Sequence, residues 1–194
     1  GIKVMLSNLG ASRLKRRLLS EQNELGSFRG IFTSKARTAG LRRLKATQGV
    51  RCNYLLRDQF FAGKLPRLQA RDAYLQNMLA SDYILCARGR GNFSYRFYET
   101  LCCGRIPLFI NTDCVLPFQD QINWSKYVVW VEEREVKHLG TVLKRFHSGI
   151  SNQQFQELQK DCRRLWKEWL SPAGFFIQFA RTMRSLNQLC DVHE

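Results

Sequence analysis

Apolar residues along the chain follow two patterns, short continuous runs and stripes that repeat every three or four residues. The continuous runs predict five strands, at residues 2–7, 50–56, 83–87, 106–110 and 127–131. Helical spacing and cap signals predict helices between them, at residues 12–20, 36–47, 69–80 and 93–103. Residues 28–32 fit either a short strand or a loop. Strands that alternate with helices of this length predict an α/β fold, with a parallel sheet flanked by helices.

The last quarter of the chain carries helical patterns alone. Ser151 and Gln154 form a capping box, which predicts the start of a helix. Two apolar stripes then follow at helical spacing, before and after Ser171, namely Phe155, Leu158, Cys162, Leu165, Trp166 and Trp169, then Phe175, Phe176, Phe179, Met183 and Leu186. Such stripes are typical of core packing rather than of a ligand site. We therefore expect two C-terminal helices over residues 151–190, strapped across the sheet or against a neighbouring domain.

Length and charge narrow the possible partners. A chain of 194 residues suits a single domain over residues 1–194, in which residues 1–50 are the least clearly assigned. No apolar run is long enough to predict a transmembrane segment. The net charge is +15, and residues 1–72 hold 16 basic and 4 acidic side chains. This excess suits a polyanion, a phosphorylated small molecule or an anionic membrane, or else a solvated face without a specific partner.

The seven cysteines form no C-x-x-C pair, and His138, His147 and His193 have no metal-ligand spacing. We therefore expect no metal site and solvated histidines. Most of the cysteines stand among apolar neighbours, where a free cysteine packs as a small hydrophobic residue. Free thiols favour a reducing compartment, and hence a cytoplasmic location.

The residues best suited to chemistry lie where the predicted strand 83–87 passes through a glycine-rich turn into the helix 93–103. This stretch carries Arg88, Gly89, Arg90, Gly91, Ser94, Arg96 and Glu99. Glycines let a ligand approach the backbone, and arginines with the free N–H groups at a helix start favour phosphate. Arg96 and Glu99 share a helix face, so Arg96 suits a diphosphate and Glu99 the two hydroxyls of a ribose. The alternative is a surface ion pair between the two.

Polar residues at the ends of other predicted strands extend this candidate site. Ligands of open α/β sheets bind beyond the carboxyl ends of the strands, where Arg57, Asn111 and Asp113 stand. Asp113 suits either sugar hydroxyls or the capping of a turn. Ser94 occupies a position where the dinucleotide fingerprint has glycine, but Asp113 lies 22 residues after Gly91. A nicotinamide oxidoreductase therefore remains a minor alternative.

Several segments resemble, in order, the signature of exostosin-like glycosyltransferases (family 47). They are residues 85–89, 94–101, 104–110, 116–118 and 122–124. The resemblance covers roughly residues 50–170 and is strongest over 81–124. Ala87 stands where many relatives have proline, a departure that affects loop stiffness more than chemistry.

The resemblance implies a two-domain GT-B architecture, in which this chain corresponds to the Rossmann-like, C-terminal half that binds the nucleotide sugar. The acceptor domain would then lie outside this chain, together with the general base, which the sequence does not identify. The implied activity is inverting transfer of a sugar from a nucleotide diphosphate sugar, with a UDP-sugar favoured, to a saccharide acceptor. No metal or other cofactor is expected. Animal relatives work in the Golgi lumen, which is the alternative location.

The basic first part of the chain supports a second hypothesis. In this alternative the chain is a non-catalytic module that binds nucleic acid or an acidic polysaccharide. No recognisable nucleic-acid-binding motif accompanies the charge, so we expect no specific nucleic acid partner.

Overall fold

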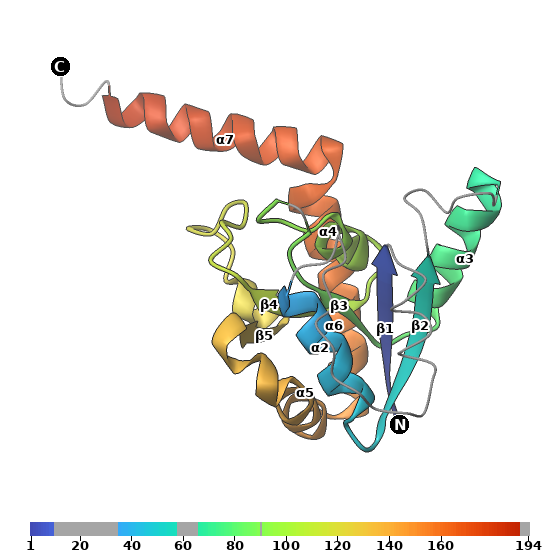
Figure 1. Cartoon of the computed structure of the whole chain (residues 1–194). Helices are drawn as coiled ribbons and strands as arrows, with labels where there is room; N and C mark the ends of the chain where they lie inside the picture. Colours follow the sequence, from blue (N-terminus) through green and yellow to red (C-terminus); the bar gives the residue numbers. More distant parts are fainter. Residues whose placement is uncertain (10–34, 58–65, 90, 191–194) are drawn as a thin grey trace.

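The computed structural model describes residues 1–9, 35–57, 66–89 and 91–190 (Figure 1). The described elements, in chain order, are β1 (Ile2–Leu9), α2 (Lys35–Lys45), β2 (Val50–Arg57), α3 (Arg67–Leu79), β3 (Tyr83–Cys86), α4 (Tyr95–Cys102), β4 (Ile106–Asn111), η2 (Trp124–Lys126), β5 (Val129–Glu132), η3 (Glu133–His138), α5 (Leu139–Ser148), α6 (Asn152–Leu165), η4 (Trp166–Leu170) and α7 (Pro172–Cys190). The five predicted strands are confirmed to within two residues at each end, and so are the helices predicted at 36–47, 69–80 and 93–103. The predictions for residues 12–20 and 28–32 lie outside the described residues.

The five strands form one parallel sheet in the order β2-β1-β3-β4-β5. This confirms the predicted α/β fold with its Rossmann-like parallel sheet. From β1 the chain moves to β2 on one side, and it then returns past β1 to β3 and continues outward to β4 and β5. The direction of winding therefore changes between β1 and β3, which is the position where doubly wound sheets of this order bind ligands.

Right-handed connections place the helices on both faces of the sheet. The helix α2 lies on one face together with η3 and α5, whereas α4 and α6 contact each other on the opposite face. Close packing links α2 to the sheet at Gly40, where an added Cβ would lie 3.0 Å from Cδ1 of Ile110. The central strands are accordingly buried from both sides, and every residue of β3 is buried, as is typical of parallel sheets.

The C-terminal segment is two helices, as predicted, but only the first of the two apolar stripes is core. Cys162 and Leu165 of α6 are buried, and α6 packs against α4. After the π-helical turn η4, the helix α7 projects away from the sheet (Figure 1). Its aromatic stripe is exposed, with Phe176 68% and Phe179 50% accessible. The prediction that this second stripe is core is therefore wrong for its described side chains, which are all exposed, although the Phe175 ring meets Phe118 at a centroid distance of 5.6 Å.

Two further features differ from the sequence analysis. The helix α5 was not anticipated, although Leu139, Leu143 and Phe146 stand at helical spacing. His147 on this helix is half-buried, and its Nδ1 lies 2.9 Å from the hydroxyl of Tyr83. The expectation of a solvated histidine is therefore wrong at His147, because Tyr83 at the start of β3 meets it inside the fold. His138 is exposed as expected, and His193 lies outside the described residues.

Candidate functional site

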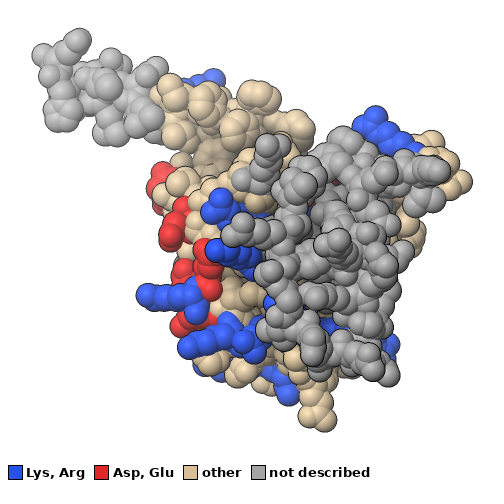
Figure 2. Space-filling model, viewed as in Figure 1, with Lys and Arg blue, Asp and Glu red and all other residues tan. Residues whose placement is uncertain are grey.

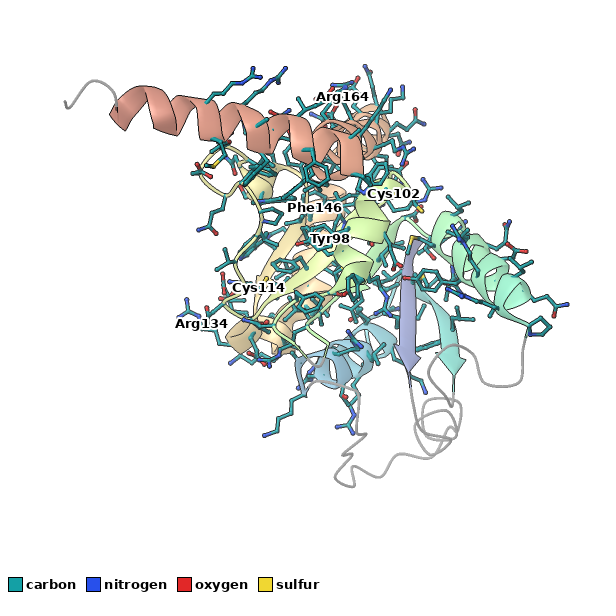
Figure 3. All side chains as sticks on the ribbon, turned by 90° about the horizontal axis from the view of Figure 1, so that it is seen from above. Tyr98, Cys102, Cys114, Arg134, Phe146 and Arg164 are labelled. Atoms are coloured by element: carbon teal, nitrogen blue, oxygen red, sulfur yellow. The ribbon has the colours of Figure 1, made fainter. Side chains whose placement is uncertain are left out.

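The glycine- and arginine-rich turn follows β3 directly, at the carboxyl edge of the sheet beside the end of β1. Figure 3 looks at the molecule from above, toward this edge, with α2 on one side of the strands and α3 and α4 on the other. Ala87 is buried, and Arg88 and Gly89 are half-buried. The Gly89 N–H donates to the carbonyl of Phe93 over 3.1 Å, which closes the turn. The predicted motif thus lies at the point where the winding of the sheet reverses.

Gly91 has a packing role in this turn. A Cβ added to Gly91 would lie 2.9 Å from Cε1 of Phe93, so any side chain there would displace the ring. The Phe93 ring also meets Tyr95 edge-to-face at a centroid distance of 5.1 Å, and Tyr95 is 74% exposed. The glycine therefore lets an exposed aromatic pair close over the turn. Arg90, a predicted site residue, lies outside the described residues.

Ser94 is the N-cap of α4, with an extended backbone. Its hydroxyl makes no capping hydrogen bond. The first turn of the helix therefore keeps the uncompensated N–H groups and partial positive charge that attract anions. Because α4 starts from the carboxyl edge, this end of the helix lies beside the turn of Arg88.

Arg96 and Glu99 lie on α4 as predicted, but they form no ion pair within 4.0 Å of each other. The Glu99 carboxylate instead accepts a hydrogen bond of 2.6 Å from the hydroxyl of Tyr74 on α3. The Nε of Arg96 is shielded from solvent and has no hydrogen-bond partner among the described residues. The surface-pair alternative is therefore wrong, since the carboxylate has another partner.

Tyr74 was not recognised from the sequence. Burial raises the pKa of its hydroxyl, the Glu99 carboxylate raises it further, and the Arg96 guanidinium opposes both. The hydroxyl therefore stays protonated near neutral pH and donates to the carboxylate. Two helices that are distant in sequence thus meet beside the predicted diphosphate residue.

Arg37 on α2 is a second residue that the sequence analysis missed. It is only 6% exposed, and its Nη2 donates to the carbonyls of Ala87 and Arg88 over 2.8 and 3.2 Å. Burial, followed by the charge of Arg96, lowers the pKa of Arg37 to about 10. The available signal was its place at helical spacing with Leu41 and Leu44 on the apolar face of the predicted helix. Its contacts hold the start of the turn in place.

The loop after β4 is tied to the turn after β3. The Asn92 side chain accepts a hydrogen bond of 2.7 Å from the Thr112 hydroxyl and donates to the carbonyl of Asp113 over 3.2 Å. Asp113 is exposed and has a left-handed backbone, with φ of 55°, so this carboxylate stands at a tight turn. Asn92 therefore connects two predicted parts of the site, although the sequence analysis gave it no role.

Asn111 points its amide toward β5 rather than toward the switch between β1 and β3. Its Nδ2 donates to Oε2 of Glu132 over 3.0 Å, and the Trp130 Nε1 donates to the other carboxylate oxygen over 2.7 Å. The structure therefore does not bring this side chain together with Arg96 and Glu99. Its role in binding stays a prediction.

Arg57 and Arg88 complete the predicted set. The backbone of Arg57 ends β2 and pairs with Leu9 at the end of β1, so it reaches the expected edge, but its side chain lies outside the described part. Within the described residues, the Arg88 guanidinium has no hydrogen bond or ion pair. The turn thus holds one half-buried arginine side chain available to an anion.

The described part of one face carries charges of both signs. Figure 2 shows lysines and arginines lying beside acidic residues along one side of the molecule, without a continuous basic patch over the described part of that face. In the part of the chain that the structure describes, no His, Cys, Asp or Glu cluster is arranged to hold a metal ion. None of the described helices is both long and apolar enough to span a membrane.

Comparison with known families shows that the residues around this edge belong to a known domain family. The exostosin GT47 domain matches residues 17–146, which is most of the chain and includes the whole turn after β3. The chain belongs to the exostosin GT47 family. The resemblance stated from the sequence is therefore confirmed.

Individual relatives of this exostosin GT47 chain are named as glycosyltransferases or as exostosins. A probable glucuronosyltransferase of Oryza sativa subsp. japonica is 40% identical over 70 residues, which are 36% of this chain and 17% of that protein. A probable beta-1,4-xylosyltransferase of Arabidopsis thaliana is 39% identical over 70 residues, again 36% and 17%. Exostosin-1 of Drosophila melanogaster is 30% identical over 98 residues, which are 50% of this chain and 12% of that protein. The matched part of this chain thus covers less than a fifth of each of these three relatives.

Proposed function

We propose that this chain binds the donor of a glycosyltransferase, which transfers a sugar from a nucleotide diphosphate sugar to a saccharide acceptor with inversion. A UDP-sugar is the favoured donor. The observation that carries the proposal is the approach of two arginines, Arg37 and Arg96, at the switch point of the sheet. Burial lowers the pKa of Arg37 most, and the positive charge of Arg96 lowers it further, so a bound diphosphate would meet two positive charges at this edge. Family membership and the names of the relatives support glycosyl transfer.

The chemistry of the transfer makes use of this charge. When the acceptor hydroxyl attacks the anomeric carbon, the bond to the diphosphate breaks and its electrons pass to the leaving phosphate oxygen. Arginine side chains and helix N–H groups that are already in place stabilise that developing charge. Arg88, Arg96 and the start of α4 at Ser94 are the groups that would do so here. Because these cationic groups can carry this role, we expect binding in the presence of a chelator.

The test is calorimetric titration of the chain with UDP, GDP and NAD in the presence of EDTA. We expect UDP to bind, and Arg96→Gln to weaken this binding by at least tenfold, because a charge-assisted hydrogen bond contributes about 1.5–3 kcal/mol. Arg164→Gln is the matched control. Its guanidinium is exposed in an ion pair with Asp161 of 3.0 Å, and it lies at the edge of the molecule beside α7 (Figure 3). Binding of NAD alone, or of none of the three, would contradict the proposal.

The non-catalytic alternative rests on the excess of basic over acidic side chains in residues 1–72, 16 against 4. If the chain binds polyanions through phosphates or sulfates, its affinity for a labelled duplex or for heparin should fall steeply with added salt. Such binding should be equally sensitive to Arg96→Gln and Arg164→Gln, whereas UDP binding should depend on Arg96 alone. The same pair of variants therefore separates the two functions.

A further inference from the structure

The hydrogen bond between Tyr74 and Glu99 is unusual for a contact at an exposed carboxylate. It joins α3 to α4 across 25 residues of sequence with a length of 2.6 Å, which is typical of a charge-assisted bond between a hydroxyl and a carboxylate. Glu99 itself is exposed, so the bond is not needed to compensate a buried charge. An ordered, exposed carboxylate beside a half-buried arginine suggests a binding role rather than a contribution to stability.

The bond leaves the carboxylate with one defined free face. Tyr74 contacts Oε2, and Oε1 has no partner among the described residues. An ionised carboxylate only accepts hydrogen bonds, so the partner for Oε1 must be a donor. The 2′- and 3′-hydroxyls of a ribose are donors of this kind, and 2′-deoxyribose has only one of them.

Arg96 and Glu99 are close enough for one ribonucleoside diphosphate to reach both, with its diphosphate at Arg96 and its ribose at Glu99. Residues three apart on a helix have Cβ atoms about 5–6 Å from each other, and in such a nucleotide the diphosphate follows the ribose directly. Arg96 stands on the same helix face as Glu99 but forms no ion pair with it, because the Tyr74 hydroxyl is the partner of the carboxylate. The same hydroxyl also interacts with Arg96, whose Nε has no hydrogen-bond partner among the described residues.

We propose that Tyr74 is a positioning residue, which orients Glu99 toward the ribose hydroxyls and so makes the site select ribonucleoside over 2′-deoxyribonucleoside diphosphates. This inference rests on the proposed function, because it assigns the ribose part of the same nucleotide site. Tyr74 does not touch the reacting atoms. It acts on the ligand through the carboxylate that it holds.

The experiment compares UDP with 2′-deoxy-UDP by calorimetry, for the wild-type chain and the variants Tyr74→Phe and Glu99→Gln. We expect the wild type to prefer UDP by about tenfold, the value of one hydrogen bond to a charged group. Tyr74→Phe should weaken UDP several-fold and 2′-deoxy-UDP much less, so that the preference falls toward one. The double variant should lose no more than Glu99→Gln alone, since the two residues act as a unit. Tyr127→Phe, a half-buried tyrosine that precedes β5, should behave as wild type.

The outcomes separate this inference from the proposed function. If Tyr74→Phe keeps the wild-type preference for UDP, the tyrosine has a structural role only and the inference is wrong, while Arg96-dependent UDP binding would still stand. If the wild type binds neither nucleotide, both proposals fail. Should Tyr74→Phe not fold, the preference for UDP over 2′-deoxy-UDP is measured with Glu99→Gln instead. An unchanged preference in that variant would show that the carboxylate does not contact the ribose, and the inference that Tyr74 acts through it would be wrong.

Discussion

Replacing Arg37 by methionine tests whether this buried arginine is present for binding or for stability. Methionine has a similar length and no charge, so it fills most of the same space. The change removes the hydrogen bonds to the carbonyls of Ala87 and Arg88, and it removes one positive charge that acts on Arg96. Arg43→Met on the same helix is the control, because Arg43 is exposed.

Two opposing contributions to the free energy of unfolding can be set against each other. Hydrogen bonds to a charged group contribute about 1.5–3 kcal/mol each, so the loss of both costs roughly 3–6 kcal/mol. The lowering of the pKa of Arg37 to about 10 means that the fold disfavours its charged form by roughly 3 kcal/mol, and methionine removes this penalty. We therefore expect Arg37→Met to destabilise the chain by no more than about 3 kcal/mol.

Urea unfolding measures the stability of the variant, and titration with UDP measures its binding. We expect a loss of stability of no more than about 3 kcal/mol, together with a loss of UDP affinity of at least tenfold, because the turn is no longer held and one positive charge is gone. A loss of stability above about 4 kcal/mol would show that the arginine mainly supports the fold. A UDP affinity equal to that of Arg43→Met would refute the assignment of Arg37 to the site.

Three further changes test neighbouring features. Asn92→Ala removes the bonds to Thr112 and Asp113, so calorimetry should show several-fold weaker UDP binding while the unfolding free energy falls by only about 1 kcal/mol. Asp113→Gly should raise that free energy by up to about 1 kcal/mol, since glycine tolerates a φ of 55°, and it should leave UDP affinity unchanged; a tenfold loss would place the carboxylate in the nucleotide site. Burial raises the pKa of the Cys86 thiol from 9.0 to about 11, so the stability it contributes is complete below pH 9 and is lost as the pH rises through 11. Between pH 9 and 11, the unfolding free energy measured in urea should therefore fall by about 2 kcal/mol less for Cys86→Ala than for the wild type. An equal fall in both proteins would contradict this linkage.

The positions of the strands along the sequence were predictable, because a strand that is buried on both faces of the sheet consists of a continuous run of apolar residues, as in residues 83–87. The position of the glycine- and arginine-rich turn followed from the rule that parallel sheets bind ligands at their carboxyl edge. The partners inside the site were not predictable. Tyr74 reads as an apolar-face residue of a helix, and only the packing of α3 against the sheet brings it to Glu99. The exposed stripe of α7 shows the reverse, since a helical pattern does not reveal whether another layer covers it.

The position of β1 in the interior of the sheet, between β2 and β3, also bears on how the chain folds. Val4 pairs with Cys52 on one side and with Tyr83 on the other, so its second neighbour is synthesised long after it. Until then an apolar strand retains an open hydrogen-bonding edge, which is a hazard for aggregation. Parallel pairings between distant segments also form slowly. Efficient production of this domain will therefore depend on how well β1 is shielded during translation, and slower growth at lower temperature should raise the yield of folded protein.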